Sequence, residues 1–221
     1  METEIRSESY VDDLCTRYPA LVPIRSSISQ AYELLHDSVV HQGMIYTCGN
    51  GGSCADADHI VGELMKSFTR KRPISENIAK NLEMYGSIFG EKLIDGLEGT
   101  IPALNLSQQT ALTTAFANDN SFSLGFAQQL YGYGHKGDSL IALSTSGNSE
   151  NVVLACVLAQ AKGIHVIALT GNKVSEIEKF ADVTIKVPES ETFKIQELHL
   201  PIYHCLCLML ENSLWPIGSV K

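Results

Sequence analysis

The chain contains 221 residues, of which 44% are hydrophobic, with 17 Gly and 7 Pro. This composition is typical of a globular enzyme domain and excludes disordered, collagen-like and low-complexity polypeptides. Sixteen basic and 25 acidic residues give a formal net charge of −9 at pH 7. The acidic balance argues against nucleic acid or an anionic membrane as a partner, whereas a small anionic ligand needs only local hydrogen-bond donors.

The sequence predicts a cytoplasmic protein without disulfides. Its first residues, METEIRSESY, contain no basic segment followed by an apolar stretch, so we expect no secretory signal. No run approaches the roughly 18 to 20 apolar residues that a membrane-spanning helix needs. Because the cysteines form no CxxC pair, we expect reduced core thiols, with the one beside a glycine-rich loop, Cys54, as the exception to watch. The six are Cys15, Cys48, Cys54, Cys156, Cys205 and Cys207.

Two helices are predicted within residues 1–42, divided by Pro19 and Pro23. In the second helix, apolar residues recur at spacings of three and four and form one stripe. The stripe consists of Ile24, Ile28, Ala31, Leu35 and Val39. Because such a stripe needs a partner surface, we expect these helices to pack on the main domain and on a second subunit.

Five short apolar runs follow, each succeeded by a Gly or Ser turn and a segment of helical length. This alternation predicts parallel strands joined by right-handed crossovers, with helices on both faces of the sheet. We therefore expect an α/β fold, a three-layer α-β-α sandwich over residues 43–214, in a single domain spanning 1–221. The predicted strands are residues 44–48, 101–106, 139–143, 165–169 and 183–187. Ligands of such sheets bind beyond the carboxyl ends of the strands, which directs attention to the loops after Cys48 and Leu143.

Residues 66–98 have no obvious place in this pattern. They begin with the basic cluster Thr69-Arg70-Lys71-Arg72-Pro73 and continue through a predicted helix over residues 82–97. Residues from about 75 to 99 are interpreted as an extended insertion. The basic cluster is compatible with a solvated turn or with a contribution to phosphate binding.

A glycine-rich loop, GNGGS at 49–53, leads from the first strand directly into a helix. Glycines let backbone N–H groups approach an anion, and the helix N-terminus adds a partial positive charge. Cys54 stands where a dinucleotide fingerprint needs its third glycine, and no Gly-Lys-Ser/Thr follows, so no nucleotide cofactor is expected. A tight turn without a ligand remains an alternative. The candidate ligand-binding residues here are Asn50, Gly51, Gly52 and Ser53.

A second loop, STSGNS at 144–149, precedes a helix predicted over residues 152–162. It offers four hydroxyls, from Ser144, Thr145, Ser146 and Ser149, and no Lys or Arg. Ser and Thr are ordinary N-cap residues, but one cap needs only one hydroxyl. Two such loops at the same edge of a sheet predict a phosphorylated ligand.

The chain resembles the sugar isomerase (SIS) fold family in three motifs that occur in the same order: GNGGS at 49–53, STSGNS at 144–149 and IQELH at 195–199. Within that family it is similar to the phosphoheptose (sedoheptulose 7-phosphate) isomerases over about residues 43–211. The resemblance implies a five-stranded parallel sheet of flavodoxin-like type. It also implies a homotetramer with active sites between subunits and a Ser/Thr loop that holds the sugar phosphate.

Ionisable side chains lie at helical spacings on two predicted helices. His59 and Glu63 are four residues apart and share one face of the helix after the glycine loop. Gln196 and His204 are eight residues apart on a helix predicted over 195–214, so they also share a face, and His199 could join them. Either pair could instead be structural: a solvated helix face, or histidines buried in the core.

The resemblance to the phosphoheptose isomerases implies a role for several of these residues. Glu63 resembles the base and His204 the acid of an aldose-ketose isomerisation, and Asp119 resembles a substrate-contacting aspartate, although an Asx turn is the alternative for it. In metal-containing members, the residues matching His59, Glu63, Gln196 and His204 hold zinc, so one zinc per active site is expected. A carboxylate on the metal is less free to take a proton, and the sequence leaves open which duty Glu63 performs.

The expected function is isomerisation of a sugar phosphate, D-sedoheptulose 7-phosphate to D-glycero-D-manno-heptose 7-phosphate, by proton transfer through an enediol. Two alternatives remain. One is a non-catalytic SIS protein that binds a phosphosugar as a sensor or as a partner of a replication initiator. The other is an isomerase or epimerase of another sugar phosphate, because the insertion is longer than usual and Phe193 stands where these isomerases carry an aspartate.

Overall fold

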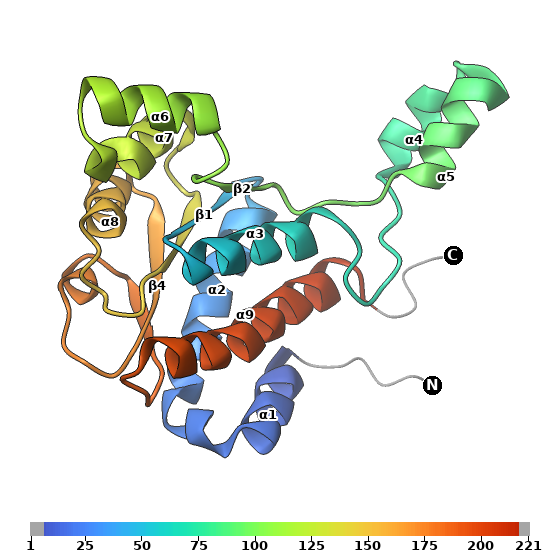
Figure 1. The fold of residues 1–221 in the computed structure, drawn as a ribbon. Coiled ribbons are helices and arrows are strands. Elements are labelled where there is room, and N and C mark those ends of the chain that lie inside the picture. Colours follow the sequence, from blue (N-terminus) through green and yellow to red (C-terminus); the bar gives the residue numbers. More distant parts are fainter. Residues whose placement is uncertain (1–6, 217–221) are drawn as a thin grey trace.

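The centre of the molecule is a five-stranded parallel sheet with strand order β2-β1-β3-β4-β5 (Figure 1). The computed structural model describes residues 7–216. All residues of β1 and β3 are buried, as expected where helices cover both faces of a sheet. The predicted α/β fold with a five-stranded parallel sheet is therefore confirmed, with small differences at the strand ends. The strands are β1 (Ile45–Gly49), β2 (Ala103–Asn105), β3 (Ser139–Leu143), β4 (His165–Thr170) and β5 (Val183–Lys186).

Helices form a layer on each face of the sheet (Figure 1). Successive residues of β1 point to opposite sides, so Ile45 joins one hydrophobic cluster and Tyr46 the other. The first cluster is completed by α1 (Ser7–Arg17), α2 (Arg25–Val40), α3 (Gly52–Met65) and α9 (Thr192–Leu214). The second is completed by α7 (Gly125–Tyr133) and α8 (Glu150–Lys162), with α6 (Thr110–Asp119) packed on α7. Short 3-10 turns are η3 (Phe122–Leu124) and η4 (Glu176–Lys179).

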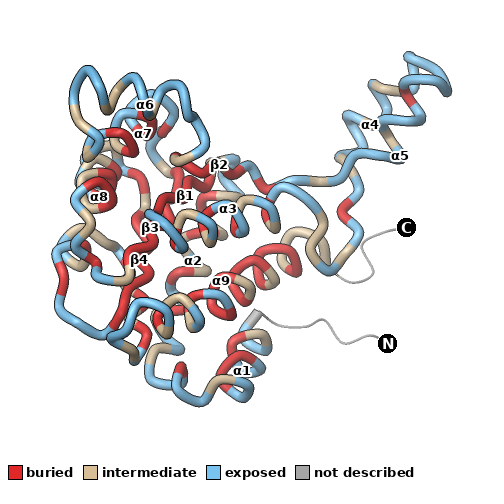
Figure 2. Tube along the Cα trace, in the orientation of Figure 1, coloured by how far each residue is buried: buried red, intermediate tan, exposed pale blue. Residues whose placement is uncertain are grey.

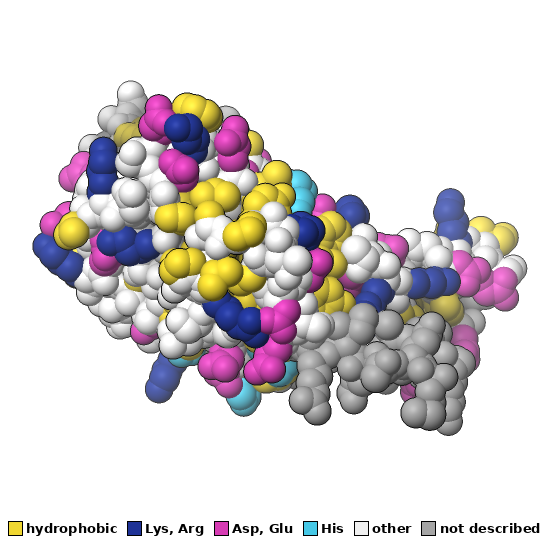
Figure 3. Space-filling model, turned by 90° about the horizontal axis from the view of Figure 1, so that it is seen from below, with side chains coloured by type: hydrophobic (Ala, Val, Ile, Leu, Met, Phe, Trp, Pro, Cys, Tyr) yellow, Lys and Arg dark blue, Asp and Glu magenta, His cyan; other side chains and the backbone are white. Residues whose placement is uncertain are grey.

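The two predicted N-terminal helices are present as α1 and α2, joined by the proline-containing turn η1 (Pro19–Ile24). Three residues of the predicted stripe, Ile28, Ala31 and Leu35, are fully buried. Both helices contact α9, so they pack on the main domain as predicted. Their packing on a second subunit stays a prediction. The face that carries α1, seen from below in Figure 3, gathers many hydrophobic side chains.

A helical hairpin, here called the arm (residues 76–96), projects from the body (Figure 1). It consists of α4 (Glu76–Glu83), a π-helical turn η2 (Ser87–Glu91) and α5 (Lys92–Gly96). Figure 2 shows it almost entirely exposed, in contrast to the buried sheet. Several large apolar side chains are exposed on it, including Met84, Tyr85, Ile88 and Phe89.

The prediction of one continuous helix over residues 82–97 is wrong. Helix α4 ends at Glu83, and Gly86 then adopts a φ of 68°, a left-handed conformation that stops the helix. Gly90 approaches the Leu82 carbonyl so closely that a Cβ at this position would collide with it. These glycines fold the segment back on itself, which a pattern of apolar residues does not reveal.

Both interpretations of the basic cluster at 69–73 are wrong for Arg72. Its side chain is neither solvated nor near the proposed phosphate loops, because it is 1% exposed and forms an ion pair with Glu211 of α9. Arg70 donates hydrogen bonds to the Trp215 carbonyl and to the Tyr10 hydroxyl. The cluster therefore has a structural place at the junction of α3, the arm and α9.

All six cysteines are free thiols, of which five are buried and Cys54 is partly exposed, in agreement with the prediction of reduced core thiols. Burial raises the pKa of the Cys156 and Cys205 thiols to about 12. Within residues 7–216, none of the helices has the length and apolarity that crossing a bilayer requires.

Candidate active site

The two candidate phosphate loops begin side by side, because Gly49 at the end of β1 pairs with Leu143 at the end of β3. A reciprocal amide pair joins them. Asn50 Nδ2 donates to Asn151 Oδ1 over 2.9 Å, and Asn151 Nδ2 donates back to Asn50 Oδ1 over 2.8 Å. Sequence reasoning did not single out Asn151, whose position behind the serine loop gave no sign of this contact. The side chain of Asn50 therefore connects the loops.

The turn between β1 and α3 requires glycine at two positions. Gly51 has φ 56° and ψ −122°, a conformation that side-chain-bearing residues rarely adopt. A Cβ on Gly49 would lie 2.6 Å from the Ser53 carbonyl oxygen. The turn therefore brings the first residues of α3 close to the end of β1, with the partial positive charge of the helix N-terminus at the loop.

Both loops line one cavity of about 290 Å³, which we call the cradle. Among residues 7–216, its lining contains amide, hydroxyl and backbone groups but no Lys or Arg side chain. Among the residues predicted to bind substrate, all line the cradle except Asp119 and Ser146; Leu143 and Thr192 join them. The full lining is Asn50, Gly51, Gly52, Ser53, Leu143, Ser144, Thr145, Ser149, Thr192 and Gln196.

The hydroxyls of the serine loop are divided between local bonds and the cradle. Ser144 Oγ accepts from Gly147 N and donates to Ser149 Oγ, both over 3.1 Å. Ser149 stands at the N-cap of α8, yet its side chain makes no capping hydrogen bond. Its hydroxyl accepts from Ser144 and keeps its own O–H to donate to a ligand in the cradle.

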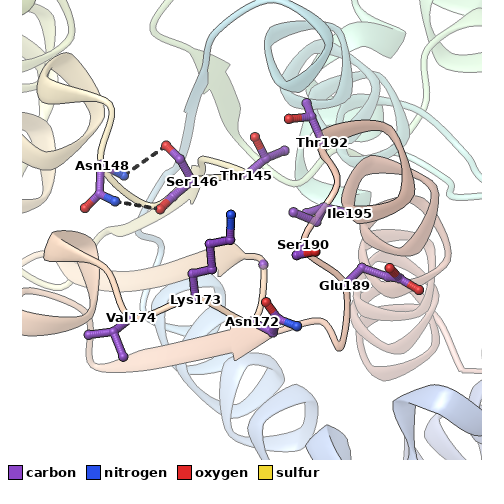
Figure 4. A pocket seen from close by; sticks show the side chains of 11 residues that line it. Thr145, Ser146, Asn148, Asn172, Lys173, Val174, Glu189, Ser190, Thr192 and Ile195 are labelled. Carbon is purple, nitrogen blue, oxygen red and sulfur yellow. Dashed lines mark hydrogen bonds between the residues drawn. The ribbon is translucent and has the colours of Figure 1, made fainter.

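A second hollow of about 350 Å³ adjoins the cradle, since Thr145 and Thr192 line both. Ser146 faces this hollow and accepts hydrogen bonds from Asn148, through its Oγ over 3.2 Å and its carbonyl over 3.0 Å (Figure 4). The Lys173 side chain extends toward Thr145 and Ser146 (Figure 4). The hollow thus adds one cation, Lys173, and one carboxylate, Glu189, beside the neutral cradle.

Gln196, in the second turn of α9, lies over the start of α3. A Cβ on Gly52 would meet the Gln196 side-chain nitrogen at 2.6 Å and its side-chain oxygen at 3.0 Å. Gln196 therefore belongs to the cradle in this chain.

A separate group, which we call the His59–Glu63–His204 cluster, forms where α3 packs on α9. His59 Nε2 lies 3.2 Å from Glu63 Oε1 and 3.4 Å from His204 Nε2. Two residues that sequence reasoning missed support it. The Tyr203 hydroxyl lies 3.0 Å from His59 Nδ1 and 3.2 Å from Asp56 Oδ1, so it connects the imidazole to a second carboxylate. Only the four-residue spacing of Asp56 and Ile60 along an apolar helix hinted that Asp56 faces inward.

Burial shifts the pKa of two side chains at the cluster, His204 and Asp56. Burial lowers the pKa of His204, and the neighbouring His59 lowers it further. Burial raises the pKa of Asp56, against the hydrogen bond from Tyr203 and the charge of His59. Glu63 is 13% exposed at its side chain, and its Oε2 is buried without a hydrogen-bond partner among the described residues, with Lys66 Nζ 3.6 Å away.

The cradle and the cluster lie apart within one chain. Ser53 and Glu63 are ten residues apart on α3, which places them about 15 Å apart along the axis, and Gln196 and His204 are about 12 Å apart on α9. No residue of the cluster lines the cradle or the adjoining hollow. Asp119 lines neither cavity: it ends α6, exposed, and accepts a hydrogen bond from Asn118.

The side chains of the cluster are of the types that bind zinc, but their arrangement in this structure does not form a zinc site. Imidazole nitrogens and a carboxylate are common zinc ligands. Two ligand atoms that each lie about 2.0 to 2.1 Å from a tetrahedral ion are about 3.3 Å apart. The separations of His59 from Glu63, 3.2 Å, and from His204, 3.4 Å, are close to this value. However, no three His, Cys, Asp or Glu side chains within residues 7–216 are arranged so that they could hold a metal ion. Gln196 of the same chain lies over Gly52 and does not join them.

His199 is buried in the core and takes no part in either group. Neither ring nitrogen has a hydrogen-bond partner within the described chain. Burial lowers its pKa from 6.5 to about 4, and the nearby Thr170 backbone offsets part of this lowering. The possibility that His199 joins the face of Gln196 is therefore wrong, because its side chain points into the apolar interior.

This burial predicts acid sensitivity. Between about pH 6.5 and pH 4 the unfolded chain binds a proton at His199 and the folded chain does not. As the pH is lowered from 7 to 4, this residue should therefore decrease the free energy of unfolding by about 3 kcal/mol. Urea unfolding of the wild type and of His199→Leu at pH 7, 5 and 4 measures it. The variant should lose less stability on acidification, whereas the exposed His135→Leu should follow the wild type. Equal losses in wild type and His199→Leu would contradict the assignment.

Comparisons with known proteins match this chain over most of its length. The family model for the SIS domain matches residues 10–99 and 98–171. The phosphoheptose isomerase of Coxiella burnetii is 34% identical over 211 residues, which cover 94% of this chain and 93% of that protein. Two solved phosphoheptose isomerases are similar in structure. The one from Neisseria gonorrhoeae has 30% identity and a TM-score of 0.69 over 93% of both chains. The one from Francisella tularensis has 29% identity and a TM-score of 0.71 over 93% of this chain and 94% of its own.

Proposed function

Because this chain belongs to the SIS domain family and, within it, to the phosphoheptose isomerases, we propose that it interconverts D-sedoheptulose 7-phosphate and D-glycero-D-manno-heptose 7-phosphate. The observation that carries the proposal is the cradle: two loops at the carboxyl ends of neighbouring strands, held together by Asn50 and Asn151, that surround one cavity with neutral donors. Such a cavity suits a phosphate group, and the open hollow beside it leaves room for the sugar.

The chemistry requires a base and a proton relay. In the direction from ketose to aldose, Glu63 removes the proton from the carbon next to the carbonyl, which gives an enediol, and returns it to the neighbouring carbon. His204, kept neutral by its lowered pKa, donates its N–H proton to the carbonyl oxygen and recovers a proton from the adjacent hydroxyl. At the end Glu63 is again a carboxylate and His204 again carries its N–H proton, so the enzyme is unchanged and the substrate is isomerised without an external oxidant or reductant.

We further propose that each active site forms between two copies of this chain. One copy supplies the cradle with its Gln196, and another supplies the His59–Glu63–His204 cluster, because the two groups lie about 12 to 15 Å apart along α9 and α3 of one chain. The hydrophobic face that carries α1 and the exposed apolar side chains of the arm offer surfaces for such an assembly (Figure 3). A homotetramer with four such sites fits the requirement.

Ser149 should matter more for binding than Ser146. Ser149→Ala removes a hydroxyl that lines the cradle and should weaken phosphosugar binding by about 1 to 3 kcal/mol, or roughly 5- to 150-fold in Kd. Ser146→Ala should weaken binding less, because its oxygen accepts a hydrogen bond from Asn148 and lines the adjoining hollow, where we place the sugar and not the phosphate. Calorimetric titration with sedoheptulose 7-phosphate measures both. An equal loss for the two variants would place the phosphate outside the cradle.

The proposed reaction is tested with purified protein. Sedoheptulose 7-phosphate and a panel of hexose and pentose phosphates are each incubated with it, and the products are separated by chromatography. We expect isomer exchange for the heptose phosphate. Exchange for another sugar alone would change the substrate and keep the reaction class. Tight binding without exchange across the panel would overturn the proposal in favour of a phosphosugar-binding protein.

For zinc, we propose that His59, Glu63 and His204 are the residues that hold it, after side-chain rotation, with Gln196 of a second copy as a further ligand. When bound, the ion would polarise the oxygens of the substrate. Zinc content after loading and gel filtration tests this: about one zinc per active site in the wild type, and clearly less in His59→Ala. The exposed His135→Ala serves as control. Equal zinc content in wild type and His59→Ala would refute the assignment.

A further inference from the structure

A buried ion pair, Arg72 with Glu211, lies at the end of α3, next to the His59–Glu63–His204 cluster. Arg72 Nε lies 2.7 Å from Glu211 Oε1, and both side chains are fully buried. Removing two charges from water is expensive, and a buried pair on its own often stabilises a fold no better than apolar residues of the same size. The additional contacts of this pair indicate a role beyond stability.

Arg72 holds the turn that contains Glu63. Its guanidinium donates to the Leu64 carbonyl over 2.8 Å and to the Glu63 carbonyl over 3.0 Å, and it stacks on the Trp215 ring at 5.0 Å. The carbonyls of the last turn of a helix have no partners within the helix, and a cation there is favourable. The guanidinium therefore fixes the end of α3 from which the Glu63 side chain extends.

Glu211 holds the opposite side of the cluster. It accepts hydrogen bonds from Phe68 N over 2.8 Å, from Thr69 N over 2.9 Å and from Thr69 Oγ1 over 2.7 Å. Burial opposes its ionisation, but these bonds and the one from Arg72 lower its pKa below the ordinary value. The loop fixed in this way places the Phe68 ring 5.5 Å from the His204 ring.

We propose that Arg72 and Glu211 are positioning residues of the isomerase, which hold the carboxylate of Glu63 and the imidazole of His204 in register across α3 and α9. This inference rests on the proposed function. Within the described residues, neither member of the pair lines the cradle, so its removal should affect the chemical step and leave phosphate binding unchanged. A merely structural pair would instead change stability and leave the kinetics of the folded protein as they are.

Two variants test the proposal. Arg72→Lys keeps the charge but loses the planar fork that reaches Glu211 and both carbonyls at once. The double variant Arg72→Met with Glu211→Leu replaces the pair by apolar residues of similar size. In both we expect kcat to fall about 10- to 100-fold, because small displacements of reacting groups have effects of this size, with KM within about twofold of the wild type. The exposed pair Lys179→Met with Glu176→Leu is the control and should keep the wild-type kcat.

Circular dichroism and thermal melts establish which variants are folded. A folded Arg72→Lys with wild-type kcat would overturn the proposal, even if the double variant does not fold, and so would a loss confined to KM. If the wild type itself shows no isomerase activity, the proposed function fails. Amide hydrogen exchange then tests, without any assay of activity, whether Arg72 and Glu211 hold the loop at Phe68 and Thr69. Exchange at Phe68 and Thr69, which donate to Glu211, should be faster in Arg72→Lys than in the wild type, and unchanged exchange would reject the positioning role.

Discussion

Glu63→Gln is expected to lower kcat by about 10²- to 10⁴-fold while the Kd for sedoheptulose 7-phosphate stays within about twofold. Glutamine has nearly the same shape as glutamate but cannot take the proton next to the substrate carbonyl. Binding should persist because Glu63 does not line the cradle. Stopped-flow or coupled assays give kcat, and calorimetry gives Kd.

The control for this variant is Glu33→Gln, which removes an exposed carboxylate from α2 and should keep the wild-type kcat. If Glu63→Gln turns over normally, Glu63 is not the base. If it loses both turnover and binding, the carboxylate contributes to holding the substrate, and the division between cradle and cluster has to be abandoned.

Two inactive variants should restore activity when they assemble together. Glu63→Gln damages only the cluster. Ser149→Asp damages only the cradle, because it keeps a good N-cap residue at α8 but places a negative charge at the proposed phosphate site. If each site combines the cradle of one copy with the cluster of another, random pairing leaves about a quarter of the sites intact in mixed oligomers. Co-expression with two different tags, followed by purification on both, provides the mixture for assay.

The matched control combines Glu63→Gln with His204→Ala. Both changes lie in the cluster, so every mixed site has one defect and no activity should return. Recovery in this control would mean that Glu63 and His204 act from different copies. Absence of recovery in the first mixture, with oligomers confirmed by light scattering, would place each complete active site within a single chain.

The sheet and the cradle could be predicted because their determinants are local. Short apolar runs ending in glycine or serine define β1 and β3, and neighbouring parallel strands bring their following loops together. The glycines at 49–52 and the hydroxyls after Leu143 mark the two candidate phosphate loops in the sequence itself. Fold and ligand class therefore follow from patterns within a few residues.

Other features depend on contacts between distant residues. Arg72 bonds to Glu211, which is 139 residues away in the sequence, and the Tyr203 hydroxyl bonds to Asp56, which is 147 residues away. Because the sequence does not show that Glu211 lies beside Arg72, the basic cluster at 69–73 suggests a solvated surface or an anion site. Similarly, the arm folds back because Gly86 and Gly90 allow it, whereas the apolar pattern alone favoured one long helix. The apparent agreement of Gln196 with the zinc ligands came from family resemblance, and the geometry of one chain places it elsewhere.

The absence of Lys and Arg from the lining of the cradle has a consequence for the response to ionic strength. The chain has a net charge of −9, so it repels a phosphate dianion at long range, while attraction comes from short hydrogen bonds and helix termini. Dissolved salt screens the repulsion over a Debye length of about 10 Å at 0.1 M but leaves short contacts largely unscreened. Moderate sodium chloride should therefore leave substrate affinity unchanged or raise it, which is the reverse of the behaviour of a lysine-lined phosphate site.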